Sequence, residues 1–181
     1  PPPGSKKKAY SWPFAALGVV QTNNQQYSQS IVSFQAALRI APTDYYSWVG
    51  LGESYHNAGR HVAATRAFAK ADGLDHGLPP GETWFAKYML ANVQREMGLF
   101  EEAIKAYKEV LMLKPEEFGV LLALLQTISE SAWAHIALGM FGEAVKLANS
   151  AIEVASNIAK NNVQFFNLWK AVGDACSVLG H

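Results

Sequence analysis

Apolar and small residues recur along the chain at an interval of 34 positions. Between residues 48 and 71, an aromatic residue is followed by Leu beside Gly, and then by Ala and Phe in a second apolar stripe; the members are Trp48, Leu51, Gly52, Tyr55, Gly59, Ala64, Phe68 and Ala71. The equivalent residues one interval earlier are Phe14, Leu17, Gly18, Ser30, Phe34 and Ala37, closed by Pro42. Because each stripe has helical spacing, every interval is predicted to form two amphipathic helices joined by a turn.

The small residues indicate how the two helices of an interval cross. Gly18 and Gly52 are expected at the crossing, where a missing side chain lets the backbones approach, and Ala64 is expected to face it. Gly59 is expected in the left-handed conformation that ends a helix. We expect the large apolar residues of the pattern to be buried between helices, namely Phe34, Trp48, Leu51, Tyr55 and Phe68.

This spacing is similar to the signature of the tetratricopeptide repeat, in which a helix pair recurs about every 34 residues. The resemblance implies an all-α fold, a right-handed superhelical solenoid of antiparallel helix pairs. One pair cannot bury its apolar face alone, so neighbouring pairs stack, and such stacks bind proteins more often than they catalyse reactions.

Two further copies of the pattern are irregular. The third runs through Gly98, Phe100, Ala103 and Tyr107 to Pro115, with five extra residues that we place in a loop at 78–82, before Trp84. The fourth contains Gly139, Phe141, Ala144 and Ala148, and its first helix is expected to be stretched by two turns, from Phe118 to Leu138. The apolar run 120–125 in that helix is too short to span a bilayer, which favours a buried solenoid helix.

The fifth copy is incomplete. Trp169, Val172, Gly173 and Cys176 repeat the first-helix pattern, on a helix expected at about 163–179, but no second helix follows. We therefore expect an exposed apolar stripe that promotes association, and a chain that is part of a longer protein. The predicted organisation is a flexible linker or expression remnant at 1–10 and a solenoid at 11–181, with four repeats, the fourth stretched, and the first helix of a fifth.

Charge and composition favour a protein-binding module. Fifteen Lys and Arg residues balance fifteen Asp and Glu residues, so no basic face for nucleic acid is expected, and the one cationic run is Lys6-Lys7-Lys8. No signal peptide or membrane-spanning pattern is present, and the single Cys176 cannot form an internal disulfide. A cytoplasmic chain, or a nuclear one, fits these features.

No combination of residues indicates catalysis or a cofactor. Gly50-x-Gly52 follows no strand and lacks a third glycine, so a helix crossing is favoured over a phosphate loop. His56 and His61 are five residues apart and do not share a helix face, so no metal site is expected. The chain is predicted to be no enzyme, with no cofactor and no metal.

A more specific resemblance rests on the stretch SIVSFQAALRIAPTDYYSWVGLGESYHNAGR at 30–60, on the opening at 12–18 and on NLWKAVGDACS at 167–177. These segments resemble the tetratricopeptide scaffold subunits of the superkiller complex. The resemblance implies a cytoplasmic, non-catalytic scaffold that holds an RNA helicase of the DExH type and WD-repeat propellers, in an assembly that feeds mRNA to the exosome for 3′-to-5′ decay.

Three other interpretations are weighed against this one. A co-chaperone clamp for an acidic peptide terminus needs Lys, Asn and Arg, but the corresponding positions hold Ala15, Val19, Gly50, Phe85 and Met89. An unrelated peptide-binding adaptor and a helical accessory domain of an enzyme both remain open. The identity of the partner and the oligomeric state are not set by the sequence.

The partner surface is predicted on the concave side, which first helices form. Counting from Trp48, its residues are Tyr46, Val49, Glu53 and His56 in the second copy and Tyr88, Asn92 and Arg95 in the third, with Phe85, Trp12 and Val19 beside them. Aromatic residues and Arg are typical of protein-binding hot spots. For Trp12 and Phe85, packing against an adjacent repeat is an equally good interpretation.

Overall fold

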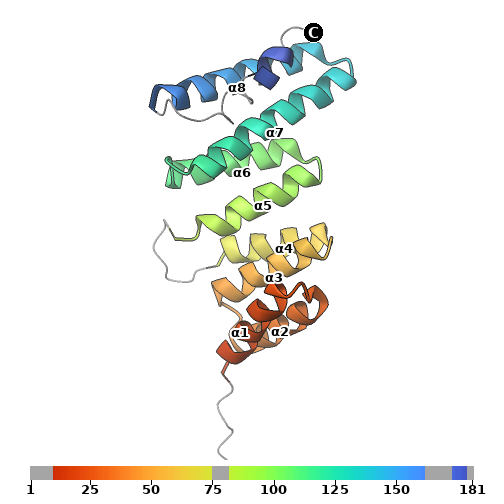
Figure 1. Cartoon of the computed structure of the whole chain (residues 1–181), viewed down its shortest axis with the longest axis vertical. Helices are drawn as coiled ribbons and strands as arrows, with labels where there is room; N and C mark the ends of the chain where they lie inside the picture. The colour runs from red at the N-terminus through yellow and green to blue at the C-terminus, as the bar shows by residue number, and fades with distance from the viewer. Residues whose placement is uncertain (1–9, 75–81, 162–172, 179–181) are drawn as a thin grey trace, which may run out of the picture. The chain divides into compact units, whose positions relative to one another are not determined.

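A computed structural model describes residues 10–74, 82–161 and 173–178, and all regular structure in these ranges is helical (Figure 1). Eight helices are bounded as follows: α1 Trp12–Asn23, α2 Tyr27–Ile40, α3 Tyr45–Asn57, α4 His61–Asp72, α5 Trp84–Glu96, α6 Phe100–Leu113, α7 Phe118–Ala137 and α8 Phe141–Asn161. Residues 173–178 are also helical. The helix pairs predicted from the 34-residue interval are therefore present.

The chain divides into two compact units, and each is described by itself. Unit 1 comprises residues 1–93 and unit 2 comprises residues 94–181, so the division falls within α5. In unit 1, α1 packs against α2, α2 against α3, and α3 against α4; in unit 2, α6 packs against α7 and α7 against α8. The organisation expected from the sequence, a linker followed by one solenoid over 11–181, stays a prediction.

The turns between paired helices share one backbone geometry. Gly59, Gly98 and Gly139 have φ values of 72°, 76° and 74°, and the residue after each donates a hydrogen bond to a carbonyl five positions earlier. This is the left-handed helix end that the glycines predict. The first repeat has no glycine in its turn, and Gln25 adopts a φ of 60° there, a conformation that a non-glycine residue rarely takes.

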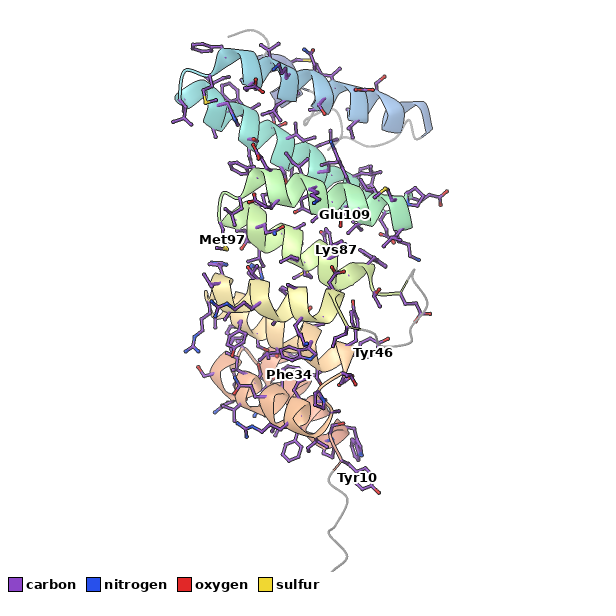
Figure 2. All side chains as sticks on the ribbon, turned by 180° about the vertical axis from the view of Figure 1, so that it is seen from behind. Tyr10, Phe34, Tyr46, Lys87, Met97 and Glu109 are labelled. Carbon is purple, nitrogen blue, oxygen red and sulfur yellow. The ribbon has the colours of Figure 1, made fainter. Side chains whose placement is uncertain are left out.

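Two phenylalanine rings fill the helix crossings of unit 1. Phe34 of α2 (labelled in Figure 2) is 2% exposed. Its ring lies against the backbones of Gly18 in α1 and Gly50 in α3. Phe68 of α4 occupies the same kind of space beside Gly52 of α3. A β-carbon on Gly18 would lie 2.9 Å from the Phe34 ring, and one on Gly52 would lie 2.6 Å from the Phe68 ring. The predicted role of glycine at the crossings is confirmed, and Ala64 is fully buried as expected.

Trp48 and Tyr55 were predicted to be buried, and this prediction is wrong because both are only half-buried. Leu51, Phe34 and Phe68 are buried, but Trp48 and Tyr55 are half-buried and pack at the edge of two core clusters. Each has a polar atom with a partner near the surface: the Trp48 indole N–H donates to the Pro42 carbonyl at 2.8 Å, and the Tyr55 hydroxyl accepts from Gln35 at 2.9 Å. These hydrogen bonds hold the two rings at the rim of the core.

Helix α7 forms the core of unit 2. It spans Phe118–Ala137, close to the predicted 118–138, and its buried residues include Val120, Leu124, Leu125 and Ile128. This helix is long and apolar enough to cross a membrane by length and composition, with half of its most apolar window buried inside the protein. Its length therefore does not exclude a membrane span, as the short apolar run had suggested, whereas its packing against α6 and α8 agrees with the predicted solenoid helix.

The end of the chain is described only in part. Ala175 and Val178 are buried, and Val178 joins a cluster with Ala132, Ala144 and Ala148, whereas Cys176 is exposed. Pro115, just after α6, is exposed. Several sequence predictions lie outside the described residues, namely the linker at 1–9, most of the insertion at 78–82, and Trp169 and Val172.

Candidate functional site

A cavity of about 400 Å³ opens on the side of unit 1 formed by first helices. We call it the unit 1 groove. Its lining comes from α1, α3 and the start of α5, with one ring from α2; the residues are Val19, Thr22, Asn23, Phe34, Tyr45, Tyr46, Val49, Gly50, Glu53, Glu82 and Phe85. This volume lies within the roughly 300–1,000 Å³ of typical ligand pockets.

The floor of the groove is rigid and apolar. The Phe34 ring is fixed between two glycines, and Val49 beside it is 8% exposed. Tyr45 ties α3 to α5, because its hydroxyl donates to the Thr83 carbonyl and accepts from the Ala86 N–H, both at 3.1 Å. Burial raises the pKa of Tyr45 above its ordinary value, so the hydroxyl keeps its proton and remains a donor.

Aromatic rings form the rim. Tyr46 (labelled in Figure 2) is 66% exposed. Its ring stands edge-on to that of Tyr45, with the ring centroids 5.3 Å apart. Phe85 contacts two neighbouring rings on α5, at 5.9 Å from Trp84 and 6.2 Å from Tyr88. Accessible π surfaces therefore border a largely apolar cavity.

The charged groups that line the groove are carboxylates. Glu53 on α3 is partly buried, and desolvation raises its pKa above the ordinary value, while the nearby His56 acts in the opposite direction. Glu82, just before α5, is exposed at the mouth. No Lys or Arg contributes to the lining among the residues that the structure describes.

A chain of hydroxyl groups behind the groove was not predicted from the sequence. Ser30 of α2 donates to Ser54 of α3 at 2.5 Å, and Ser54 lies 3.1 Å from Thr22 of α1. Ser54 donates in turn to the Gly50 carbonyl, and Thr22 donates to the Gly18 carbonyl, each one turn earlier in its own helix. The signal available in the sequence was a set of small polar residues at buried helix positions, which need partners in the fold.

The structure brings together part of the predicted partner surface. Tyr46, Val49 and Glu53 line the groove with Val19 and Phe85, whereas Trp12 is exposed and lies outside it. The partner-binding role of these residues stays a prediction.

The other predicted surface residues contact the chain itself. Arg95 donates to Gln126 at 3.1 Å and pairs with Glu130 of α7 at 3.5 Å, within unit 2. Tyr88 belongs to the ring cluster of α5, and the Asn92 amide lies 3.7 Å from the Met89 sulfur. All three are half-buried.

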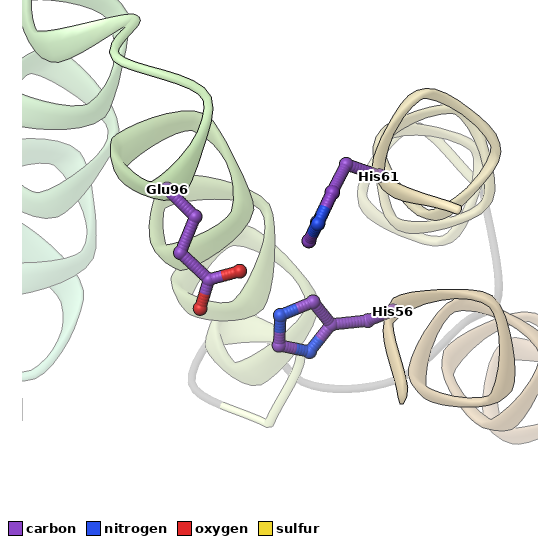
Figure 3. A group of neighbouring side chains, drawn as sticks. All are labelled: His56, His61 and Glu96. Atoms are coloured by element: carbon purple, nitrogen blue, oxygen red, sulfur yellow. The ribbon is translucent and has the colours of Figure 1, made fainter. Parts of the chain in front are cut away.

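His56 lies beside His61, although the spacing of the two residues predicted that they do not share a helix face. The imidazole centroids are 5.6 Å apart, because the tight turn at Gly59 places the end of α3 next to the start of α4 (Figure 3). His56 and His61 lie on two helices and not on one continuous helix, so their spacing in the sequence does not set the distance between them. The expected absence of a metal site stays a prediction.

The comparisons with known proteins agree with the helix-pair architecture. Tetratricopeptide-repeat family models match residues 16–79 and 86–117. The crystal structure of MamA protein superposes with a TM-score of 0.67 at 16% identity, over 94% of this chain and 82% of that one. At that identity, the likeness supports the fold alone. The predicted all-α class of tetratricopeptide solenoids is confirmed.

Two curated relatives match nearly the whole chain and indicate a narrower group of repeat proteins. Superkiller protein 3 of Schizosaccharomyces pombe is 34% identical over 94% of this chain, and superkiller complex protein 3 of Homo sapiens is 29% identical over 93% of it. The chain spans only 12% and 10% of the length of these relatives. The chain therefore belongs to the tetratricopeptide-repeat family and is similar to a segment of superkiller protein 3, as the sequence predicted.

Proposed function

We propose that the chain is a non-catalytic protein-binding scaffold, with the role of a segment of the superkiller complex subunit that it resembles. The observation that carries this proposal is the 34% identity to superkiller protein 3 over 94% of the chain. A repeat fold with a rigid, aromatic-rimmed groove supports it, since such surfaces suit protein partners.

The partners follow from the same resemblance. They are an RNA helicase of the DExH type and WD-repeat propeller subunits, in a cytoplasmic assembly that delivers mRNA to the exosome for 3′-to-5′ decay. Unwinding of RNA belongs to the helicase, and the chain positions it. The balanced charge, with fifteen cationic and fifteen acidic side chains, supports a protein rather than a nucleic acid as the direct partner.

Affinity capture tests this proposal. The tagged chain is incubated with the purified helicase and the purified propeller subunit in turn, at physiological ionic strength. Saturable capture of at least one subunit is expected. If a chain with an intact helical circular dichroism spectrum captures neither subunit, the superkiller scaffold role is wrong, and an unrelated peptide-binding adaptor becomes the better interpretation.

A further inference from the structure

We propose that the unit 1 groove binds a lysine or arginine side chain presented by an extended segment of a partner protein. The inference deepens the proposed scaffold function and rests on it. It names the chemistry of what the groove takes: an aliphatic stem that ends in a cation.

The two carboxylates that line the groove indicate that its ligand is positively charged. Glu53 lines the groove on α3, one helical turn after Val49, and within the described residues its electrostatic neighbour is His56, with no Lys or Arg ion pair. Glu82 adds a second carboxylate at the mouth. A desolvated carboxylate is stabilised by an incoming cation, whereas an acidic peptide or a phosphate would be repelled.

The apolar lining of the groove favours a cation that is carried on a long aliphatic side chain. Val19, which is 51% exposed, provides apolar surface for the methylene stem of a long side chain, and the nearly buried Phe34 and Val49 close the floor beneath it. Such a side chain buries its carbons and keeps its charged end near a polar group. The rings of Tyr46 and Phe85 lie at the opening, where a cation can contact an aromatic face. A small inorganic ion would leave these apolar walls uncovered.

The groove is also ready to receive a ligand. The Phe34 ring fits between two glycines, and the Tyr45 hydroxyl bonds to both Thr83 and Ala86, so the floor and the α5 wall are fixed. A preorganised site loses little conformational entropy when a ligand binds. Tyr46, the most exposed residue of the rim, is left to adjust its ring.

The test uses the whole chain and three peptides that differ at one position. The probes are acetyl-Ala-Leu-Xaa-Leu-Ala-amide with lysine, arginine or norleucine at Xaa, titrated while amide chemical shifts are followed by NMR. Norleucine keeps the aliphatic stem and removes the charge. Saturable shifts at Tyr46, Glu53 and Phe85 are expected with the cationic peptides, with affinity about tenfold above that for norleucine.

Matched variants show whether the preference for cationic peptides arises in the groove. Glu53→Gln is expected to reduce lysine-peptide affinity about tenfold and to leave norleucine-peptide binding unchanged, since it removes one charge at constant shape. Glu102→Gln, an exposed charge on α6 outside the groove, should change neither. Tyr46→Ala should weaken cation binding and Tyr46→Phe should retain it.

Three results would overturn the inference: equal binding of the norleucine peptide, full lysine-peptide binding by Glu53→Gln, or concentration-dependent shifts of the groove without peptide, which would assign it to a second copy of the chain. These results are separable from the scaffold proposal. Capture of the helicase or propeller by a chain that binds no cationic peptide leaves the scaffold role standing and removes only the groove assignment.

Discussion

The glycines at the helix crossings show how one missing methyl group sets the packing of a repeat. We expect Gly52→Ala to destabilise the chain by about 1–3 kcal/mol, because the new β-carbon would lie 2.6 Å from the Phe68 ring. Gly119→Ala in α7 is the matched control, since no atom lies within 4 Å of its added carbon and alanine favours the helix by up to about 1 kcal/mol. Urea denaturation followed by circular dichroism measures both. A stable Gly52→Ala variant would mean that the Phe68 ring moves freely.

Glu53 is expected to lower the stability of the fold at neutral pH. Its folded-state pKa is raised by burial, so the stability contribution of this group is present below the pKa of the unfolded chain and is lost as pH rises through the folded pKa. Glu53→Gln should therefore melt at a higher temperature than the unaltered chain at pH 7. The difference should shrink below about pH 4, where the carboxylate is protonated in both states.

Thermal melts from about pH 3 to pH 8, with Glu102→Gln as an exposed control, test this prediction. A Glu53→Gln variant with unchanged stability at pH 7 would show that the carboxylate is fully solvated in the folded chain. A stabilising substitution at a conformationally fixed groove is typical of residues kept for binding rather than for folding.

At the scale of elements, substitutions at the left-handed turn position are expected to change stability in opposite directions, according to whether glycine is added or removed. Gln25 adopts the φ of 60° that glycines adopt in the later repeats, so Gln25→Gly should stabilise the chain by about 0.5–1 kcal/mol. Gly59→Ala should destabilise it by a similar amount or more, because no neighbouring atom is near and the effect is purely one of the backbone. The two midpoints of urea unfolding should shift in opposite directions. Shifts of the same sign would contradict the shared turn geometry.

The link between α3 and α5 depends on one hydroxyl group. Tyr45→Phe removes the hydrogen bonds to Thr83 and Ala86 and should cost about 1–3 kcal/mol at pH 7, because the buried Ala86 N–H and the partly buried Thr83 carbonyl lose their partner. The folded-state pKa of Tyr45 is raised, so its contribution is complete below the unfolded pKa and is lost as pH rises through the folded one. The stability difference between the two chains should therefore narrow above about pH 10. A constant difference up to pH 11 would rule out titration of this hydroxyl.

The sequence predicted elements better than it predicted the surroundings of side chains. Gly59, Gly98 and Gly139 identified their turns because only glycine adopts that conformation at low cost, and α7 was located because two added turns preserve the helical phase. Gln25 escaped notice because nothing in a glutamine signals a positive φ. Trp48 was expected in the core because its position is apolar in the pattern, but its hydrogen bond to Pro42 depends on the loop that the fold places beside it.

The sequence could predict which helix face carries the residues of the candidate site, but it could not predict that a cavity lies between them. Helical phase alone places Tyr46, Val49 and Glu53 on one side of α3. The hollow between them depends on Val19 from α1 and Phe85 from α5, and on how far the glycines let the helices approach. These are tertiary distances, and no local pattern encodes them. The pairing of His56 with His61 across a turn was missed for the same reason.

For the whole molecule, the balance of charge leads to a prediction about RNA. The assembly proposed above would need an RNA-binding surface, and a chain with fifteen cationic and fifteen acidic side chains, whose groove carries carboxylates, is poorly suited to provide it. We expect no binding of a fluorescent single-stranded RNA of about 20 nucleotides at physiological salt. Any weak binding at low salt should come from Lys6, Lys7 and Lys8, the only cationic run in the sequence.

Fluorescence anisotropy separates these outcomes. Replacement of the three lysines by alanine should abolish low-salt binding and leave capture of the protein partners unchanged, because electrostatic contacts to phosphate weaken steeply with salt and a groove-bound side chain does not depend on this run. Binding that persists in the alanine variant at physiological salt would place an RNA surface on the folded repeats. The scaffold would then contact the substrate of the assembly directly, and the proposed division of labour between helicase and scaffold would be wrong.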